Sequence, residues 1–232
     1  MNNRKRTALC LLGAALCVFM AFGAALYFGR YPITLQALLA GDAMAMRTFT
    51  VLRLPRAVMA LAGGFGLGVA GFVYQTVFRN PLASPDIIGV SSGASVGAAC
   101  AILFVSSGTL GTTVCAFAGG LAAVFLSLGL AAAAPGRSKM NLVLAGIAVH
   151  ALAQTLLMLL KLTADPEKEL ASIEYWIMGS LAGVTQSRVW FPVPMVISCC
   201  AVIFALHRQA MLLSVEEDEA RLLGVPVGRM RF

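Results

Sequence analysis

Arg53 and Arg56 are the residues of this chain best suited to binding a charged group, because they stand three positions apart at the start of an apolar, glycine-rich run. A guanidinium is a planar fork that binds a carboxylate through two hydrogen bonds, so two neighbouring guanidiniums could hold one acidic patch. The alternative is that both side chains lie at a membrane surface with their charged ends in water. The sequence leaves both interpretations open.

A second chemically distinctive segment is residues 214–226, near the end of the chain. Ser214 and Glu217 form a capping-box pattern, which predicts the start of a helix. The acidic run 216–219 suits the positive end of a helix, and Gly224 would end it. The helix would have an apolar side made of Leu222, Leu223 and Val225. A solvated loop would not need an apolar side. We therefore expect a short helix outside the bilayer that covers a partner surface. The alternative is a solvated polar loop.

Polar residues in or beside apolar runs are candidates for lining a path across the membrane, because polar groups in lipid turn inward. His150 and Gln154 are four positions apart and would share one helix face. Gln75 lies near the end of the glycine-rich run, and the turn that follows contains Asn80 and Pro81. The alternative is that these groups hydrogen-bond neighbouring helices. The sequence does not separate the two roles.

The sequence contains no recognisable set of catalytic or metal-binding residues. It has no phosphate-binding G-x-x-x-x-G-K-[ST], no nucleophile elbow, no H-E-x-x-H and no C-x-x-C. Gly66, Gly68 and Gly71 match a dinucleotide fingerprint, but they lie inside an apolar run rather than after a strand. Gly64 and Gly68 there favour the close approach of another helix. We therefore expect a protein that is not an enzyme, has no metal site and binds no cofactor directly.

Membrane-spanning helices must position these residues. Hydrophobic residues make up 59% of the 232 positions, charged residues make up 12%, and the mean hydropathy is +0.87, so too few polar groups exist to cover a soluble globule. Six apolar runs can cross a bilayer as helices, at residues 8–28, 57–78, 87–105, 110–134, 140–162 and 189–206. We expect an all-α polytopic membrane helix bundle that forms a single domain over residues 1–232.

Basic residues predict the orientation of the bundle. The basic cluster 4–6 directly precedes the first apolar run, and such clusters are held in the cytoplasm. By alternation, Arg53 and Arg56 would lie outside and residues 214–226 would lie in the cytoplasm. Residues 172–180, in an outer loop, could form a short helix. The net charge of +7 is scattered rather than gathered into one stripe, so we expect a membrane protein with no nucleic-acid partner.

Seven short motifs follow one another along the chain. They are Arg53-Leu54-Pro55-Arg56, the glycine-rich span ending at Gln75, Arg79-Asn80-Pro81-Leu82-Ala83-x-Pro85, Gly89-x-Ser91-x-Gly93-Ala94, Leu144-Ala145-Gly146-Ile147-Ala148, Trp176-x-Met178-Gly179-Ser180 and Asp218-Glu219-Ala220-Arg221-x-Leu223-Gly224-Val225. In this order they resemble the permease subunits of ABC importers for iron-siderophores, haem and vitamin B12. The resemblance covers essentially the whole chain after residue 30.

This resemblance implies partners and residue roles. In that family the permease pairs with a second copy or a paralogous permease, two cytoplasmic ATPase subunits use ATP, and a periplasmic or lipoprotein substrate-binding protein delivers the chelate at the inner membrane. Arg53 and Arg56 match arginines that face the binding protein. Residues 214–226 match the coupling helix that contacts the ATPase. The coupling role would fall on Glu216, Glu217, Asp218, Glu219, Ala220, Arg221, Leu223 and Gly224.

The chain differs from that family in length. Family members have roughly ten spans of about twenty residues each. We therefore expect that the C-terminal third of the family fold is missing, as in a truncated product, a fragment or half of a split subunit. Three alternatives stay open: a secondary transporter, a membrane-embedded enzyme and a non-transporting membrane fragment. No acidic residue lies inside a span, which counts against the transporter. No catalytic cluster occurs in the sequence, which counts against the enzyme. The sequence does not name the chelate.

Overall fold

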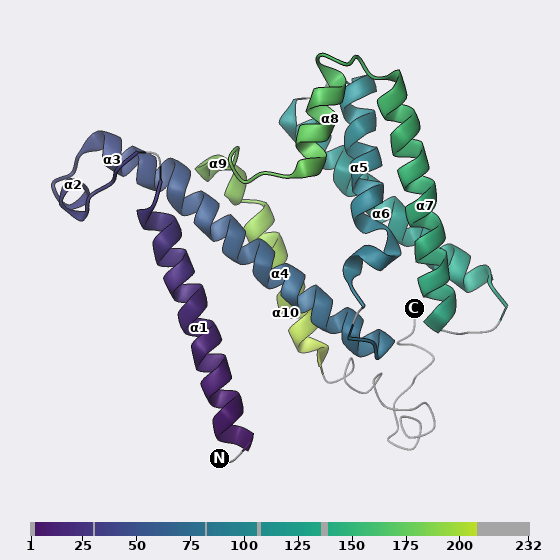
Figure 1. The fold of residues 1–232 in the computed structure, drawn as a ribbon, viewed down its shortest axis with the longest axis horizontal. Helices are drawn as coiled ribbons and strands as arrows, with labels where there is room; N and C mark the ends of the chain where they lie inside the picture. Colours follow the sequence, from purple (N-terminus) through teal and green to yellow (C-terminus); the bar gives the residue numbers. More distant parts are fainter. Residues whose placement is uncertain (1–2, 30, 82, 106–107, 136–138, 208–232) are drawn as a thin grey trace. The chain divides into compact units, whose positions relative to one another are not determined.

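The structure is a computed structural model that describes residues 3–29, 31–81, 83–105, 108–135 and 139–207. Within these ranges every regular element is a helix, which confirms the predicted all-α membrane bundle (Figure 1). Five segments are long and apolar enough to cross a membrane, and they coincide with five of the predicted runs, although the second begins earlier than expected. These segments are Arg4–Tyr27, Ala43–Phe78, Thr109–Ala133, Met140–Thr163 and Gln186–Ala205.

The remaining predicted run, 87–105, forms a shorter helix. Its α-helical part, α5 (Val90–Cys100), has 11 residues, and the π-helix η3 (Ala101–Val105) adds 5 more. The helix begins only after Gly89, whose φ of 82° separates it from the 3₁₀-helix η2 (Pro85–Ile88). A residue in the left-handed conformation ends a helical hydrogen-bond ladder. The expected full-length span is therefore interrupted near its start.

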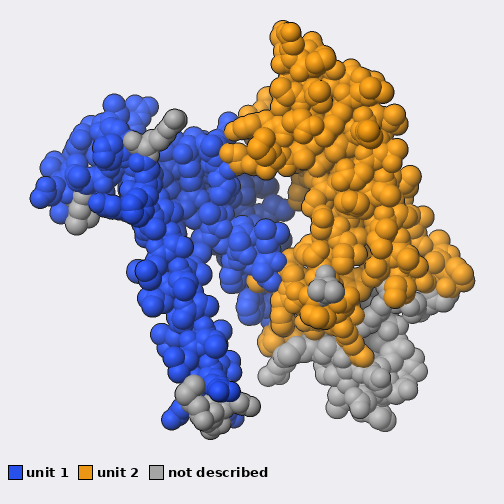
Figure 2. All heavy atoms as spheres, in the orientation of Figure 1, with its two compact units in different colours: residues 1–68, 181–205 blue, residues 69–180, 206–232 orange. Residues whose placement is uncertain are grey.

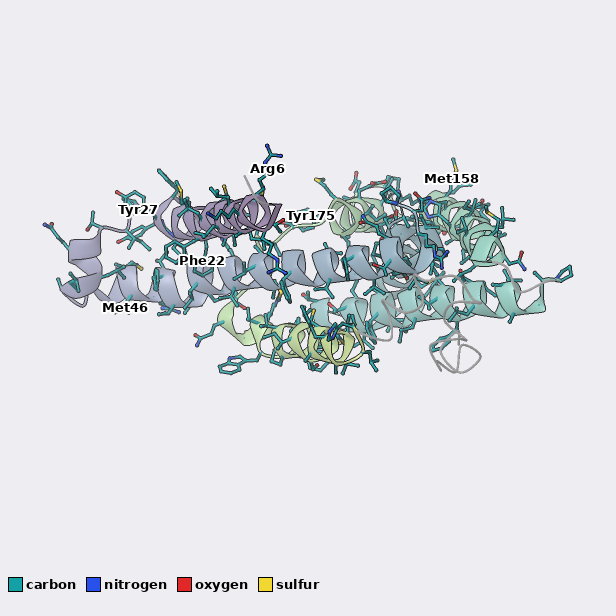
Figure 3. The ribbon with its side chains drawn as sticks, turned by 90° about the horizontal axis from the view of Figure 1, so that it is seen from below. Arg6, Phe22, Tyr27, Met46, Met158 and Tyr175 are labelled. Atoms are coloured by element: carbon teal, nitrogen blue, oxygen red, sulfur yellow. The ribbon has the colours of Figure 1, made fainter. Side chains whose placement is uncertain are left out.

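The chain divides into two compact units, which Figure 2 colours separately. Unit 1 contains the described residues of 1–68 and 181–205. Figure 3 shows Arg6 and Tyr27 near the two ends of its first helix. The helices of unit 1 are α1 (Asn3–Tyr27), α2 (Leu35–Leu39), α3 (Ala43–Arg47), the π-helix η1 (Thr48–Arg53), the first part of α4 (Leu54–Phe78), α9 (Gln186–Val189) and α10 (Pro192–Ala205).

Short polar side chains begin the two small helices that precede η1. Thr34 accepts a hydrogen bond from the Ala37 backbone N–H at 3.3 Å, and Asp42 accepts one from the Met44 backbone N–H at 3.1 Å. These caps satisfy donors that the first turn of a helix leaves without a partner. Gly41, with a φ of 73°, turns the chain between α2 and α3. The chain thus reaches η1 through two capped turns of helix.

Unit 2 contains the described residues of 69–180 together with 206–207. Its helices are the second part of α4, η2, α5, η3, α6 (Thr109–Ala133), α7 (Lys139–Thr163) and α8 (Glu169–Met178). In Figure 1, α5 lies against α6, α7 and α8. A buried cluster joins α5, α7 and α8 and consists of Ala99, Leu157, Ala164 and Ile173. The presence of α8 confirms the short helix expected at 172–180, although it begins three residues earlier.

Glycine brings the backbones of α5 and α6 into contact. A Cβ atom placed on Gly97 would lie 2.9 Å from the carbonyl carbon of Cys115 and 3.2 Å from the Cα of Ala116. The helix contact predicted at Gly64 and Gly68 is not met within the described part of the chain, where a Cβ at either position would meet nothing within 4 Å. Small residues bring backbones together in α5 and α6, whereas the close contact in the glycine-rich span is at Gly66, where an added Cβ would lie 2.9 Å from a side-chain atom of Val196.

Candidate functional site

The backbone changes geometry at the point where it carries the two arginines. The π-helix η1 ends at Arg53, and the Leu54 N–H donates to the Phe49 carbonyl, five residues back. Pro55 follows, and a proline has no N–H and crowds the carbonyl four residues before it. The wider π-turn removes that conflict. Arg53 therefore projects from the end of the π-turn, and Arg56 projects from the first turn of α4.

The guanidinium of Arg53 is held by backbone carbonyls. Its side chain is buried, with 8% of the residue exposed. Nη1 donates to the carbonyls of Leu26 at 2.9 Å and Tyr27 at 2.6 Å, and Nη2 donates to the carbonyl of Tyr31. Leu26 and Tyr27 belong to the last turn of α1, where carbonyls have no donor within the helix. Arg53 therefore caps the C-terminus of α1.

Arg56 is held by fewer partners and is partly exposed. Its Nη2 donates to the carbonyl of Ala182, which precedes α9. Its Nε is buried and has no hydrogen-bond partner among the described residues. A buried N–H without an acceptor is costly to the folded chain. Both Nη groups of Arg53 therefore already donate to carbonyls, whereas Arg56 makes one such bond and is partly exposed.

A cavity of about 440 Å³ lies beside the two guanidiniums, within unit 1. Its walls are mostly apolar, and Arg53 and Arg56 are the charged side chains that line it. The sequence of unit 1 contains one acidic residue, Asp42, whose carboxylate caps α3. Positive charges beside apolar walls favour an anionic group, because a partly buried charge gains from an opposite charge. The full lining is Ala25, Phe28, Gly29, Tyr31, Thr48, Leu52, Arg53, Arg56, Ala57, Ala60 and Leu181.

Two of the residues predicted to line a translocation path lie one turn apart on α7 of unit 2. His150 is partly buried and packs beside Gly89, where an added Cβ would lie 3.3 Å from the His150 backbone nitrogen. Its Nδ1 is buried without a hydrogen-bond partner in the described part of the chain. Gln154 is exposed. The shared helix face is as expected from the spacing, and the path itself stays a prediction.

The other predicted path residues form the turn after α4. Gln75 is exposed on the last turns of that helix, and its backbone carbonyl accepts from the Asn80 N–H at 3.2 Å. The Asn80 carbonyl in turn accepts from the Ala83 N–H at 3.0 Å, and Pro81 is exposed between them. Arg79 adopts a positive φ of 52°, which ends the helix. The segment after α4 therefore forms the turn that its prolines predict. Its part in translocation stays a prediction.

Sequence reasoning missed two buried hydroxyls at the break before α5. Ser127 of α6 is fully buried and donates to the Ile88 carbonyl at 3.0 Å. Ser92 is also buried and donates to the Gly89 carbonyl at 2.9 Å. The Ser127 bond gives the Ile88 carbonyl a donor, whereas the Gly89 carbonyl also accepts from the Gly93 N–H at 2.9 Å. The available signal was a lone serine inside the apolar run 110–134, where a hydroxyl needs a partner.

The predicted coupling segment, 214–226, lies outside the described residues. It includes Glu216, Glu217, Asp218, Glu219, Ala220, Arg221, Leu223 and Gly224. The coupling role assigned to these residues therefore stays a prediction.

This chain belongs to the FecCD transport family, whose model matches residues 13–232. It is 33% identical over 234 residues to the molybdate import system permease protein MolB of Haemophilus influenzae, covering 96% of this chain and 68% of that protein. It is 34% identical over 237 residues to the ferric enterobactin transport system permease protein FepG of Escherichia coli, covering 99% and 70%. The cobalamin import system permease protein BtuC of Halobacterium salinarum is 35% identical over 212 residues, covering 91% and 54%.

The fold is also similar to a solved structure, that of a protein assigned as a metal-chelate type ABC transporter in an inward-facing conformation. The TM-score is 0.85 at 31% identity, and the match covers 97% of this chain and 70% of the other. The predicted family is thereby confirmed, and the chain is a multi-pass membrane protein. The chain spans between 54% and 70% of the lengths of these relatives.

Proposed function

We propose that this chain is the membrane-spanning permease subunit of an ATP-driven ABC importer that carries a metal chelate across the inner membrane. The likeness of its whole described fold to a metal-chelate type ABC transporter supports this proposal most directly. The relatives are named for molybdate, ferric enterobactin and cobalamin, each of which contains a metal atom. We infer an iron-siderophore, or the related chelates haem and cobalamin, as the cargo class.

The working assembly that we propose contains a second permease copy or a paralogous permease, two cytoplasmic ATPase subunits and a periplasmic or lipoprotein binding protein. ATP is used by the partner subunit, since this sequence lacks a phosphate-binding loop. The N-terminus lies in the cytoplasm because the basic cluster 4–6 favours that side. Gln75, Asn80, Pro81, His150 and Gln154 line the path.

The binding protein docks at the outer surface that Arg53 and Arg56 mark. Support comes from the cavity beside them, whose charged lining is cationic, and from the scarcity of acidic residues in unit 1. Carboxylates on the binding protein would supply the missing negative charge beside the partly exposed guanidinium of Arg56. An acidic patch is therefore the expected counterpart of this surface.

Residues 214–226 form the contact with the ATPase. We expect the double charge reversal Glu217→Lys and Asp218→Lys to lower co-isolation of the ATPase at least about tenfold, because like charges at an interface repel and lose their partners. The measurement is recovery of tagged ATPase with the detergent-solubilised chain. Helix content by circular dichroism should stay unchanged.

A matched control reverses charge on the opposite side of the membrane. Glu167 lies in the loop between α7 and α8 and is exposed, so Glu167→Lys should leave ATPase recovery unchanged. Equal recovery of the ATPase with the double variant and the unmodified chain would remove the coupling role from this segment.

An ion-coupled secondary transporter is the second candidate function. Such transporters place acidic side chains within the membrane to bind the coupling ion. None of the five described spans contains an aspartate or a glutamate. This absence from the spans favours the ABC importer.

A further inference from the structure

Two of the places where residues would line the path are joined by a short stretch of unit 2. Residues 83–89, which we call the connector, follow the turn at Asn80 and end beside His150 on α7. We propose that the connector is a rigid link, so that this turn and His150 move together. Its part in translocation rests on the proposed function, whereas the link itself does not.

The connector is buried although its sequence is typical of a polar turn. Ala83 is 3% exposed, Ile88 is 5% exposed and Gly89 is buried as well. The 3₁₀-helix η2 within the connector contacts α5, α6 and α7. A segment packed against three helices cannot be displaced without opening those contacts.

Gly146 lets the backbone of α7 reach the backbone of the connector. A Cβ atom at this position would overlap the Ile87 carbonyl oxygen and would lie 3.0 Å from the Ile88 Cα. Ala145 and Val149, which lie beside it on α7, are also buried. Backbone atoms cannot rotate away from a methyl group as a side chain can. A larger residue at position 146 would therefore force the connector away from α7.

Ser127 holds the same point of the connector from α6. It is fully buried, and its Oγ donates to the Ile88 carbonyl at 3.0 Å. A buried hydroxyl without a partner costs free energy, so this bond favours one position of the connector. The bond and the Gly146 contact act on adjacent residues, Ile87 and Ile88, from two different helices. Ser127 and Gly146 are therefore the positioning residues of the link.

Local hydrogen bonds join this fixed point to the turn that precedes it. The Ile87 N–H donates to the Ser84 carbonyl at 3.2 Å, and the Ala83 N–H donates to the Asn80 carbonyl at 3.0 Å. Each bond closes a loop of only a few residues, which leaves little freedom between the turn and the fixed point. The turn at Asn80 should therefore follow any displacement of Ile87.

Gly89 brings the other end of the connector to His150. Its N–H donates to the Asp86 carbonyl at 2.9 Å, and an added Cβ would lie 3.3 Å from the His150 backbone nitrogen. The φ of 82° at Gly89 favours glycine, and Ser92 donates to the Gly89 carbonyl at 2.9 Å. A displacement of this part of α7 should therefore carry the connector with it. The alternative is a hinge at Gly89 that lets the turn swing independently of α7.

Hydrogen exchange of the connector amides tests the link in the detergent-solubilised chain, without any partner subunit. The amides of Ala83, Ile87 and Gly89 all donate to nearby backbone carbonyls, so they report on opening of the connector. We expect Ser127→Ala to speed their exchange about fivefold and Gly146→Ala to speed it at least about tenfold, because each variant removes a contact that holds the connector in place.

The controls make the same two types of change elsewhere on α6. Gly129→Ala adds a methyl group where nothing lies within 4 Å, and Thr113→Ala removes an exposed hydroxyl that bonds its own helix. Both should leave connector exchange within about twofold of the unmodified chain. Unchanged exchange in Ser127→Ala or in Gly146→Ala, provided that the variant folds, would overturn the rigid link.

A distance measurement between the two ends separates the link from a general loosening of unit 2. Spin labels would be attached at the exposed positions 81 and 154 through an encoded ketone-bearing amino acid, which leaves the native cysteines unlabelled. We expect one narrow distance distribution by electron paramagnetic resonance, and its width should grow at least about twofold in Ser127→Ala, because the turn then samples several positions. A second pair at positions 113 and 154, on α6 and α7, should keep its width. Equal broadening of both pairs would overturn the link.

The same labels at positions 81 and 154 distinguish the link from a hinge when the ATPase is bound. The distance would be measured without nucleotide and with a non-hydrolysable ATP analogue. If the turn and α7 move together, the peak stays at the same distance in both states, whereas a shifted peak would overturn the link in favour of the hinge. If no ATPase is recovered with the chain, the proposed function would fall, and the exchange rates and distribution widths in detergent would still decide the link.

Discussion

Unit 1 and unit 2 are both built from apolar helices, but they hold those helices together in different ways. In unit 2, 22% of the apolar window is buried in each of the spans Thr109–Ala133 and Met140–Thr163. In unit 1 the buried share is 0% for Arg4–Tyr27 and 6% for Gln186–Ala205. Unit 2 therefore relies on packing, and unit 1 relies on a few long polar side chains such as Arg53 and Arg56.

This difference indicates where the molecule is rigid and where it can accept other surfaces. Helices in lipid gain little from burying apolar groups, so contact between their backbones at small residues is what holds them firmly. Unit 2 has such contacts at Gly97 and Gly146, where an added Cβ would strike backbone atoms of Cys115 and Ile87. Unit 1 instead leaves side chains such as Phe19 exposed, with 75% of its surface free in this chain. Lipid or another subunit must cover them.

The largest expected effect is that of Gly97→Ala, which puts a methyl group where α5 meets the backbone of α6. A backbone carbonyl cannot rotate away as a side chain can, so the two helices must separate, at a cost of about 3 kcal/mol. The measurement is the free energy of unfolding in mixed micelles titrated with a denaturing detergent. Gly129→Ala on α6 is the control, because a Cβ there would meet nothing within 4 Å and should be neutral or slightly stabilising.

A smaller effect is expected for Ser127→Ala, which removes the hydroxyl that donates to the Ile88 carbonyl. The carbonyl would be left buried without this donor, so the free energy of unfolding should fall by about 1 kcal/mol. Thr113→Ala is the control, because the exposed Thr113 hydroxyl donates to the Thr109 carbonyl within its own helix. An equal loss of stability in both variants would mean that unit 2 does not depend on this bond.

The smallest effect is expected in unit 1, for Gly66→Ala on α4. An added Cβ would lie 2.9 Å from Cγ1 of Val196 on α10, which is a side chain and can give way. The free energy of unfolding should fall by no more than about 0.5 kcal/mol, and Val196→Ala in the same chain should relieve the change. A loss as large as that of Gly97→Ala would contradict the distinction between the two units.

The sequence predicted the helices better than their contacts. Run length and hydropathy locate α1, α6 and α7 closely, because each span must satisfy its own backbone and match the bilayer. The break at Gly89 was not predicted, because a glycine inside an apolar run adopts a positive φ only when the surrounding packing requires it. The length of an apolar run therefore overestimates a span where such a glycine falls near its end.

Contacts between distant residues were the part that the sequence could not supply. The glycine-rich span predicted close packing at Gly64 and Gly68, but a glycine does not say which helix approaches it. Likewise, the spacing of Arg53 and Arg56 predicted carboxylate binding. The acceptors of Arg53 are carbonyls 22, 26 and 27 residues earlier in the chain, which no local pattern indicates.

Uptake into proteoliposomes tests the central claim most directly. The vesicles would hold this chain with its ATPase, the binding protein would be added outside, and a ferric siderophore, haem and cobalamin would each be offered. We predict that one of these chelates accumulates when the ATPase is supplied with ATP and does not when it is supplied with a non-hydrolysable analogue. Accumulation that persists without ATP and stops when an ion gradient is collapsed would contradict the account.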